Sequence, residues 1–153
     1  MCYYTSEVSC PYFHPLEPLV PHLWGCDGRH NAVLPLGDAW DGLCTALPGP
    51  PWKPGEDAIR SLCNLGYARG SCERFPCDAG PDAVRFAVSR DDGASVRIRY
   101  VVERDHHPFA QGPLEYSLAG ETFIDPPAGE ALGRQARAYV ESYLRRKKEA
   151  FGR

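Results

Sequence analysis

The chain has 153 residues, 43% of them hydrophobic and 24% charged, and its net charge at pH 7 is −3. This length and composition are typical of one globular domain with a sizeable core. The weak net charge gives no reason to expect nucleic acid or an acidic membrane as the main partner. There is no basic, apolar leader and no run of about 20 apolar residues, so we expect a cytoplasmic protein without a membrane span.

The first part of the chain, residues 1–55, shows little periodicity and many chain breakers. Fifteen glycines and fifteen prolines make up about a fifth of the sequence, and most of them precede residue 82. Aromatic residues are too frequent here for a disordered linker. We therefore expect an ordered but irregular lobe that needs tertiary anchors.

A short helix is predicted over residues 56–65. Glu56 and Asp57 fall in its first turn, where the helix dipole favours acidic groups, and Gly66 stands where a left-handed residue ends a helix. Cys63 then points inward from the last turn, and a glycine-rich loop of eight residues, "NLGYARGS", brings Cys72 back.

The remaining chain predicts strands followed by a helix. Residues 82–90 and 94–103 alternate apolar and polar around a "DDG" turn, and 113–118 is a third antiparallel strand. A helix from about 128 to 150 has an amphipathic pattern. The predicted fold class is α+β: a small antiparallel meander (82–127) packed by a C-terminal helix (128–153), with an irregular Cys/Pro/Gly-rich lobe (1–81), all in one domain.

Seven cysteines are the strongest chemical feature. Their odd number fits poorly with full disulfide pairing, and clustered thiols in a cytoplasmic protein more often serve a metal or catalysis. No two form the C-x2-C pair that is common in zinc sites. Iron–sulfur clusters accept four thiolates at more varied spacings, often beside proline. The alternative is that the cysteines are small buried apolar residues.

A four-thiolate site needs four of the seven, and we predict Cys10, Cys44, Cys63 and Cys72. Cys77 is the alternative to Cys44 as the fourth ligand, and Cys2 and Cys26 are expected to be bystanders. We expect four aromatic side chains to exclude water from this site: Tyr12, Phe13, Tyr67 and Phe75.

The motifs "CPYF", "LPLGDxWxGxC" and "CNLGYARGxCxxFP" resemble those of a group of small uncharacterised bacterial proteins. The resemblance covers the first half and, more loosely, the hairpin and its "DHHPFAQGPLEYS" continuation. It implies the set Cys10, Cys44, Cys63 and Cys72 rather than one with Cys77, and it implies no reaction.

Other candidates are weaker. Asp105, His106 and His107 are expected in a polar loop, where a Cys72–His107 nucleophile pair is conceivable. Three other histidines are candidate substitute ligands: His14, His22 and His30. "RRKK" at 145–148 is expected to be a solvated helix end, with a weak anionic or protein-partner patch as the minority interpretation. The polar sheet face with Arg85, Arg97 and Arg99 lacks the interleaved aromatics of a nucleic-acid platform.

The sequence therefore favours a [4Fe–4S] cluster-binding protein, either an electron-transfer subunit of a larger redox assembly or an accessory protein that the cluster stabilises. No catalytic residues are assigned, because four cysteine ligands leave no open iron. The first alternative is a zinc-stabilised module that binds a protein, or a nucleic acid through the basic C-terminal helix. The second is a thiol-dependent enzyme with Cys63, Cys72 or Cys77 as nucleophile.

Overall fold

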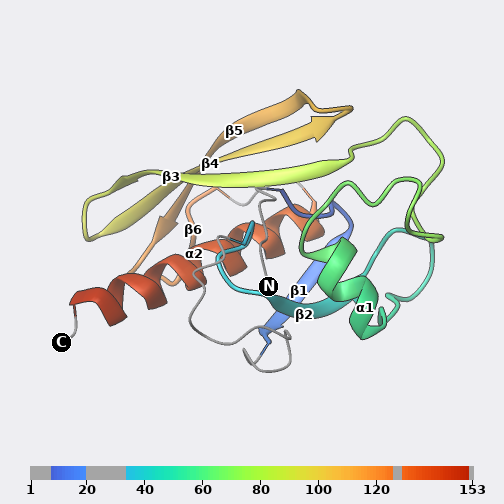
Figure 1. Cartoon of the computed structure of the whole chain (residues 1–153). Helices are drawn as coiled ribbons and strands as arrows, with labels where there is room; N and C mark the ends of the chain where they lie inside the picture. The colour runs from blue at the N-terminus through green and yellow to red at the C-terminus, as the bar shows by residue number, and fades with distance from the viewer. Residues whose placement is uncertain (1–7, 20–33, 126–128, 152–153) are drawn as a thin grey trace.

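The structure, a computed structural model, describes residues 8–19, 34–125 and 129–151. The elements are β1 (Phe13–Pro18), β2 (Trp40–Cys44), α1 (Glu56–Ala58), a π-helical turn (Ile59–Cys63), β3 (Ala83–Asp91), β4 (Ser95–Arg104), β5 (His107–Ser117), β6 (Thr122–Phe123) and α2 (Glu130–Phe151). Figure 1 shows the four-stranded sheet on one side of α2 and the β1–β2 pair on the other. The predicted α+β fold class is confirmed.

The sheet is an antiparallel meander in the order β3-β4-β5-β6. Strand β5 begins at His107 instead of residue 113, because Asp105 and His106 alone form the turn, with φ of 50° and 63°. The prediction of a loop over residues 105–107 is therefore wrong for His107, which belongs to β5. β6 pairs only with Tyr116 and Ser117, so most of β5 keeps an edge where prolines are tolerated.

Helix α2 covers one face of this sheet. Its Ala136 and Val140 are fully buried against an apolar layer formed by Val96, Ile98, Leu114 and Tyr116. The alternation predicted along β4 is the physical reason, because inward residues of one strand share a face. The helix was predicted from 128, which lies outside the described residues, and it begins at Glu130.

The basic end of α2, expected from "RRKK" to be a solvated helix end, is exposed at Arg145, Arg146 and Lys148, but it also contacts the rest of the protein. Arg145 pairs with Asp38, Arg146 donates to the Gly37 carbonyl, and Lys147 lies 2.7 Å from the Asp91 carboxylate. These contacts attach the helix to the lobe and to the end of β3. Among the described helices, none combines the length and the apolar character needed to cross a membrane.

Strands β1 and β2 were not predicted. They pair antiparallel although β1 contains Pro15 and Pro18, and the register shifts after Pro15. A proline at a register irregularity of an edge strand does not cost the sheet a backbone hydrogen bond, so such a strand can contain proline. A sequence reading that treats proline as a strand breaker therefore misses it. Pro15 faces Gly42 so closely that a β-carbon on Gly42 would lie 2.1 Å from the His14 carbonyl oxygen.

The predicted helix at 56–65 is α-helical only over α1 and then widens. The Asn64 amide donates to the Ile59 carbonyl at 3.3 Å, five residues back, which makes the last turn π-helical. The buried Asn64 side chain explains the widening, since its amide nitrogen also donates to Ile59 and to the Trp40 carbonyl. Gly66 adopts φ of 73°, which confirms the predicted left-handed end.

We predict that Gly42→Ala lowers the free energy of unfolding by about 3 kcal/mol, because the added methyl group forces the β1–β2 pair apart. Chemical denaturation measures the loss. Gly55→Ala is the control, since open space surrounds Gly55, and its effect should stay within about 1 kcal/mol. Equal effects of the two substitutions would contradict the close strand approach.

Candidate functional site

Four cysteines line one small internal hollow in the N-terminal lobe. The hollow has a volume of about 20 Å³. Its walls are Cys10, Tyr12, Phe13, Cys44, Ala46, Leu62, Cys63, Ala68, Cys72 and Phe75. The four thiols are those predicted as ligands, and the lining contains no other ionisable side chain except the phenol of Tyr12.

Each of the four thiols belongs to a different local structure. Cys10 lies in the turn before β1, and its amide donates to the Cys63 carbonyl at 3.1 Å. Cys44 ends β2, and Cys63 ends the π-helical turn. Cys72 returns on a turn in which its amide donates to the Ala68 carbonyl at 2.8 Å. Segments up to 62 residues apart in sequence thus meet at one point.

Of the other cysteines, the structure describes only Cys77, which does not join this group. Cys77 is exposed and does not line the hollow, although it follows Cys72 by only five residues. Pro76 and the turn at 72–75 direct the chain outward before Cys77 is reached. Cys2 and Cys26 lie outside the described residues. Of the two candidates for the fourth position, the structure brings Cys44 to the others.

A buried glutamine holds the first cysteine segment in place. Gln135 on α2 is fully buried, and its amide nitrogen donates to the carbonyls of Cys10 and Phe13 at 2.8 and 2.7 Å. Its amide oxygen accepts from the Ser9 hydroxyl at 2.7 Å. Sequence reasoning missed this residue; a polar residue within the apolar stripe of the helix was the available indication.

The Cys44 wall of the hollow adjoins the surface. Cys44 and Trp52 exchange two backbone hydrogen bonds of 2.7 and 3.0 Å, and the Trp52 side chain is 41% exposed. The Arg74 guanidinium lies 4.3 Å from the Trp52 ring centre. A route of a few covalent and hydrogen bonds therefore leads from this thiol to an exposed aromatic ring.

Three of the four expected aromatic residues surround the thiols. Phe13 is buried, and Tyr12 meets Phe75 edge to face with centroids 5.4 Å apart. The expectation for Tyr67 is wrong. Its ring stacks on His106 at 4.1 Å and its hydroxyl donates to Glu103, because its φ of 51° turns it toward the sheet.

Tyr67 and Arg69 instead fasten the loop between Cys63 and Cys72 to the sheet. The Arg69 guanidinium donates to Asp82 at 2.7 Å and lies 4.7 Å from the Phe75 ring centre. Burial alone would raise the pKa of Asp82, but the Asp105 amide and Arg69 outweigh it and hold that pKa below its ordinary value. The loop is therefore fixed by a charged pair as well as by its two ends.

Two of the four thiols, Cys10 and Cys63, have pKa values raised above the ordinary cysteine value. Burial, reinforced by the neighbouring thiols Cys44 and Cys72, raises the pKa of Cys10 to about 12. Burial and the other three thiols also raise the pKa of Cys63. A nucleophilic cysteine needs the opposite shift, so these two residues fit poorly with thiol catalysis.

The four thiols line one hollow but do not form a ready-made site for a metal ion. Sulfurs at the corners of a tetrahedral zinc site lie about 3.8 Å apart, given a Zn–S bond of about 2.3 Å. Among the residues that the structure describes, no three His, Cys, Asp or Glu side chains form a group that could hold a metal ion as they stand. A metal centre held by these thiols would therefore need them to rearrange.

The histidines give no partner to these thiols in the described part of the chain. His14, His106 and His107 are not among the residues that line the hollow. His107 begins β5 and pairs with Arg104, which places it in the sheet and gives no support to a Cys72–His107 pair. His22 and His30, the other candidate ligands, lie outside the described residues.

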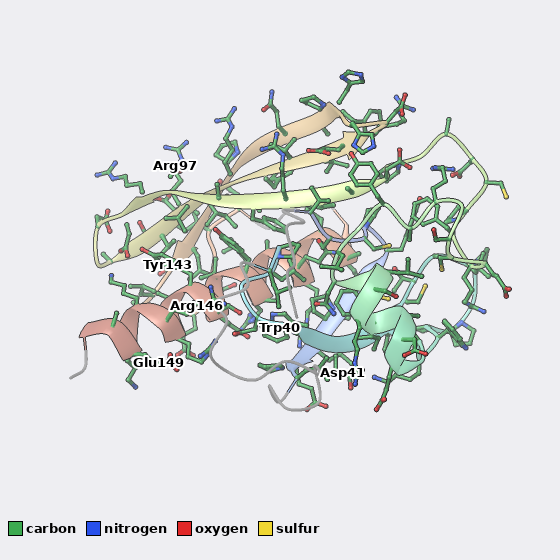
Figure 2. The ribbon with its side chains drawn as sticks, in the orientation of Figure 1. Trp40, Asp41, Arg97, Tyr143, Arg146 and Glu149 are labelled. Carbon is green, nitrogen blue, oxygen red and sulfur yellow. The ribbon has the colours of Figure 1, made fainter. Side chains whose placement is uncertain are left out.

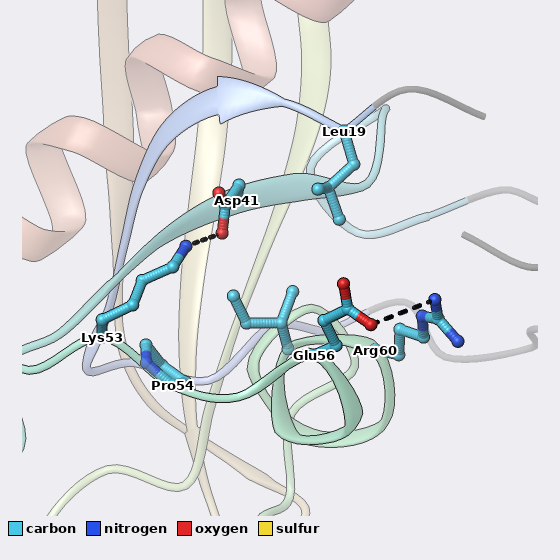
Figure 3. A pocket seen from close by; sticks show the side chains of 7 residues that line it. Leu19, Asp41, Lys53, Pro54, Glu56 and Arg60 are labelled. Carbon is cyan, nitrogen blue, oxygen red and sulfur yellow. Dashed lines mark hydrogen bonds and ion pairs between the residues drawn. The ribbon is translucent and has the colours of Figure 1, made fainter. Parts of the chain in front are cut away.

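A second hollow of about 190 Å³ lies between β2 and α1 (Figure 3). Its floor is apolar, with Leu19, Pro54 and Ile59, and four charged residues line its rim: Asp41, Lys53, Glu56 and Arg60. Lys53 already pairs with Asp41, and Arg60 lies 3.9 Å from Glu56. The charges satisfy each other, so the hollow shows no group that would select a ligand.

Comparison with known protein families, with curated proteins and with solved structures gives no match to this chain. The functional inference therefore depends on the geometry of the cysteine group.

We predict that Gln135→Leu lowers the free energy of unfolding by about 3 kcal/mol, because it removes the hydrogen bonds that Gln135 makes with two buried carbonyls and with the Ser9 hydroxyl. Denaturant titration measures this. The exposed Gln111→Leu on β5 is the matched control and should change stability by no more than about 0.5 kcal/mol. A Gln135→Leu protein as stable as the control would contradict the clamp.

We also predict a strict order of thiol alkylation in metal-free protein at neutral pH. A pKa of about 12 instead of 9.0 lowers the thiolate fraction of Cys10 about a thousandfold, and burial restricts access further. Peptide mapping by mass spectrometry should find Cys77 labelled first and Cys10 at least about a hundredfold more slowly. Comparable rates for the two would show that the hollow opens readily.

Proposed function

We propose that this protein binds an iron–sulfur cluster, [4Fe–4S], through Cys10, Cys44, Cys63 and Cys72, and serves as a one-electron carrier within a larger redox assembly. The observation that carries the proposal is the meeting of four thiols, from four separate segments, around one hollow while exposed Cys77 stays outside. Four thiolates are the usual ligand set of such clusters.

The surroundings of the four thiols support a cluster, because the lining of the hollow is apolar. An apolar shell limits the access of water, and water access is one of the factors that set a cluster's potential. A bound cluster would supply one-electron redox chemistry; the chain would contribute the four thiolates, the aromatic walls of Tyr12, Phe13 and Phe75, and the clamp of Gln135.

The position of Cys44 supports electron transfer over a purely structural role. A carrier accepts an electron from a reduced partner and passes it to an oxidised one, so the electron must cross the wall of the site. The wall at Cys44 is hydrogen-bonded to the exposed residue Trp52. Four cysteine ligands leave no iron open to a substrate, which supports a carrier over a catalyst.

The test is iron and sulfide analysis of full-length protein purified without oxygen. We expect about four irons and four sulfides per chain with broad visible absorption. Cys44→Ser should lose most of the cluster, and Cys77→Ser, the matched control, should retain it. Circular dichroism of both variants separates loss of the cluster from loss of the fold.

Colourless protein without iron or sulfide would overturn the proposal. Equal losses in Cys44→Ser and Cys77→Ser would overturn the ligand assignment.

A second candidate is a zinc-stabilised binding module that uses the same thiols. The small volume of the hollow, about 20 Å³, favours it, because one ion fills little space once the thiols close in. One zinc per chain with no visible absorption would select this function over the first. Nothing in the described basic end of α2 supports a nucleic-acid role, since three of its four basic side chains contact the protein itself.

A further inference from the structure

We infer that the open face of the four-stranded sheet is a docking surface for a partner protein that presents carboxylate groups. The face belongs to β3, β4 and β5, on the side that α2 does not cover (Figure 1). Figure 2 shows Arg97 pointing away from the sheet on that side. The inference goes beyond the cysteine site and does not depend on it.

The register places three arginines together on this face. Val96 and Ile98 of β4 point toward α2, so the alternate residues Arg97 and Arg99 point outward. Arg97 lies directly opposite Arg90 of β3. A bulge after Val88 is what brings Arg90 outward, and it leaves the next residue, Asp91, facing α2.

These guanidinium groups have little or no partner among the described residues. Arg97 and Arg99 make no side-chain hydrogen bond or ion pair there, whereas Arg85 on the same face lies 2.9 Å from Glu103. Arg90 is 71% exposed and reaches Asp92 only at 4.0 Å. Glu115 lies opposite Arg97, but its carboxylate accepts from the Ser95 hydroxyl instead.

Such an arrangement weakens the isolated sheet. Like charges on directly opposed residues of antiparallel strands repel, and Arg90 faces Arg97 without an acid between them. No packing contact requires arginine at these exposed positions. A surface that brings carboxylates would remove the repulsion, and the planar guanidinium binds a carboxylate through two parallel hydrogen bonds.

The chemistry of the face favours an acidic protein over a nucleic acid. The cross-strand neighbours in the rows of Arg97 and Arg99 are Arg90, Glu115, Ala87 and Pro113, so no ring is present on which a base can stack. The Arg104 guanidinium already lies 4.1 Å from the ring centre of Phe109, at the other end of the strands.

The experiment measures binding of a fluorescein-labelled oligoglutamate peptide to the full chain by fluorescence anisotropy at low salt. We expect the double variant R97Q/R99Q to weaken binding about tenfold or more. The control R137Q/K148Q removes the same charge from α2, at half-buried Arg137 and exposed Lys148, and its affinity should stay within about twofold. Because the substituted arginines repel Arg90, thermal unfolding of R97Q/R99Q should occur no lower than that of the wild type.

Three results would overturn the inference. The first is equal weakening by the two double variants. The second is tighter binding of a single-stranded oligonucleotide of equal charge, lost in R97Q/R99Q, which would make the face a nucleic-acid surface. The third is a lower unfolding temperature for R97Q/R99Q, which would mean that the arginines stabilise the sheet by themselves.

Discussion

The fold and the cysteine hollow both depend on the buried amide of Gln135. The helix that carries it packs its apolar stripe on the sheet, so the position of Gln135 is set by the sheet core. From there the amide fixes the turn at Ser9–Phe13, which supplies the first thiol and begins β1. A buried amide with all of its groups bonded specifies one arrangement strongly, because any other leaves polar atoms unsatisfied. The lobe has few regular elements, and this contact supplies part of the order that periodicity does not.

The hollow is neither an ordinary core nor an ordinary reactive site. Cysteines often fill cores as small apolar residues, and Cys10, Cys63 and Cys72 do pack against the buried cluster of Phe13, Trp40 and Phe75. A core filled for stability alone closes such spaces, because an unfilled void loses contacts on every side. Under the proposed function, a cluster would fill the space that these four thiols from four segments line. Because the pKa values of Cys10 and Cys63 are raised, the cluster would have to displace protons from them when it binds.

The sequence predicted those parts of the molecule that depend on local patterns. Alternation identified β3 and β4, amphipathic spacing identified α2, and Gly66 marked the end of a helix; all three are correct because each depends on neighbours within a few residues. The four cysteines that line the hollow were selected from their local settings of proline, glycine and aromatic residues. The β1–β2 pair could not be predicted, because its pairing joins distant segments and tolerates Pro15 only at a bulge. Gln135 and Asn64 were also missed, since their role lies in backbone groups far away in sequence.

The two proposed surfaces lie on different sides of the molecule, and this separation has a physical consequence. Exposed Trp52 and the Cys44 wall belong to the lobe on one side of α2, whereas Arg97 and Arg99 stand on the far face of the sheet. Under the two proposals, a partner held by the arginines would leave the Trp52 side uncovered, so that one protein could be bound at the sheet while another exchanged electrons at the lobe. Charge pairing at the sheet weakens with salt, but the apolar hollow is shielded from it. Assembly and electron transfer would then respond separately to ionic strength, as expected of a small carrier that stays attached to a larger complex.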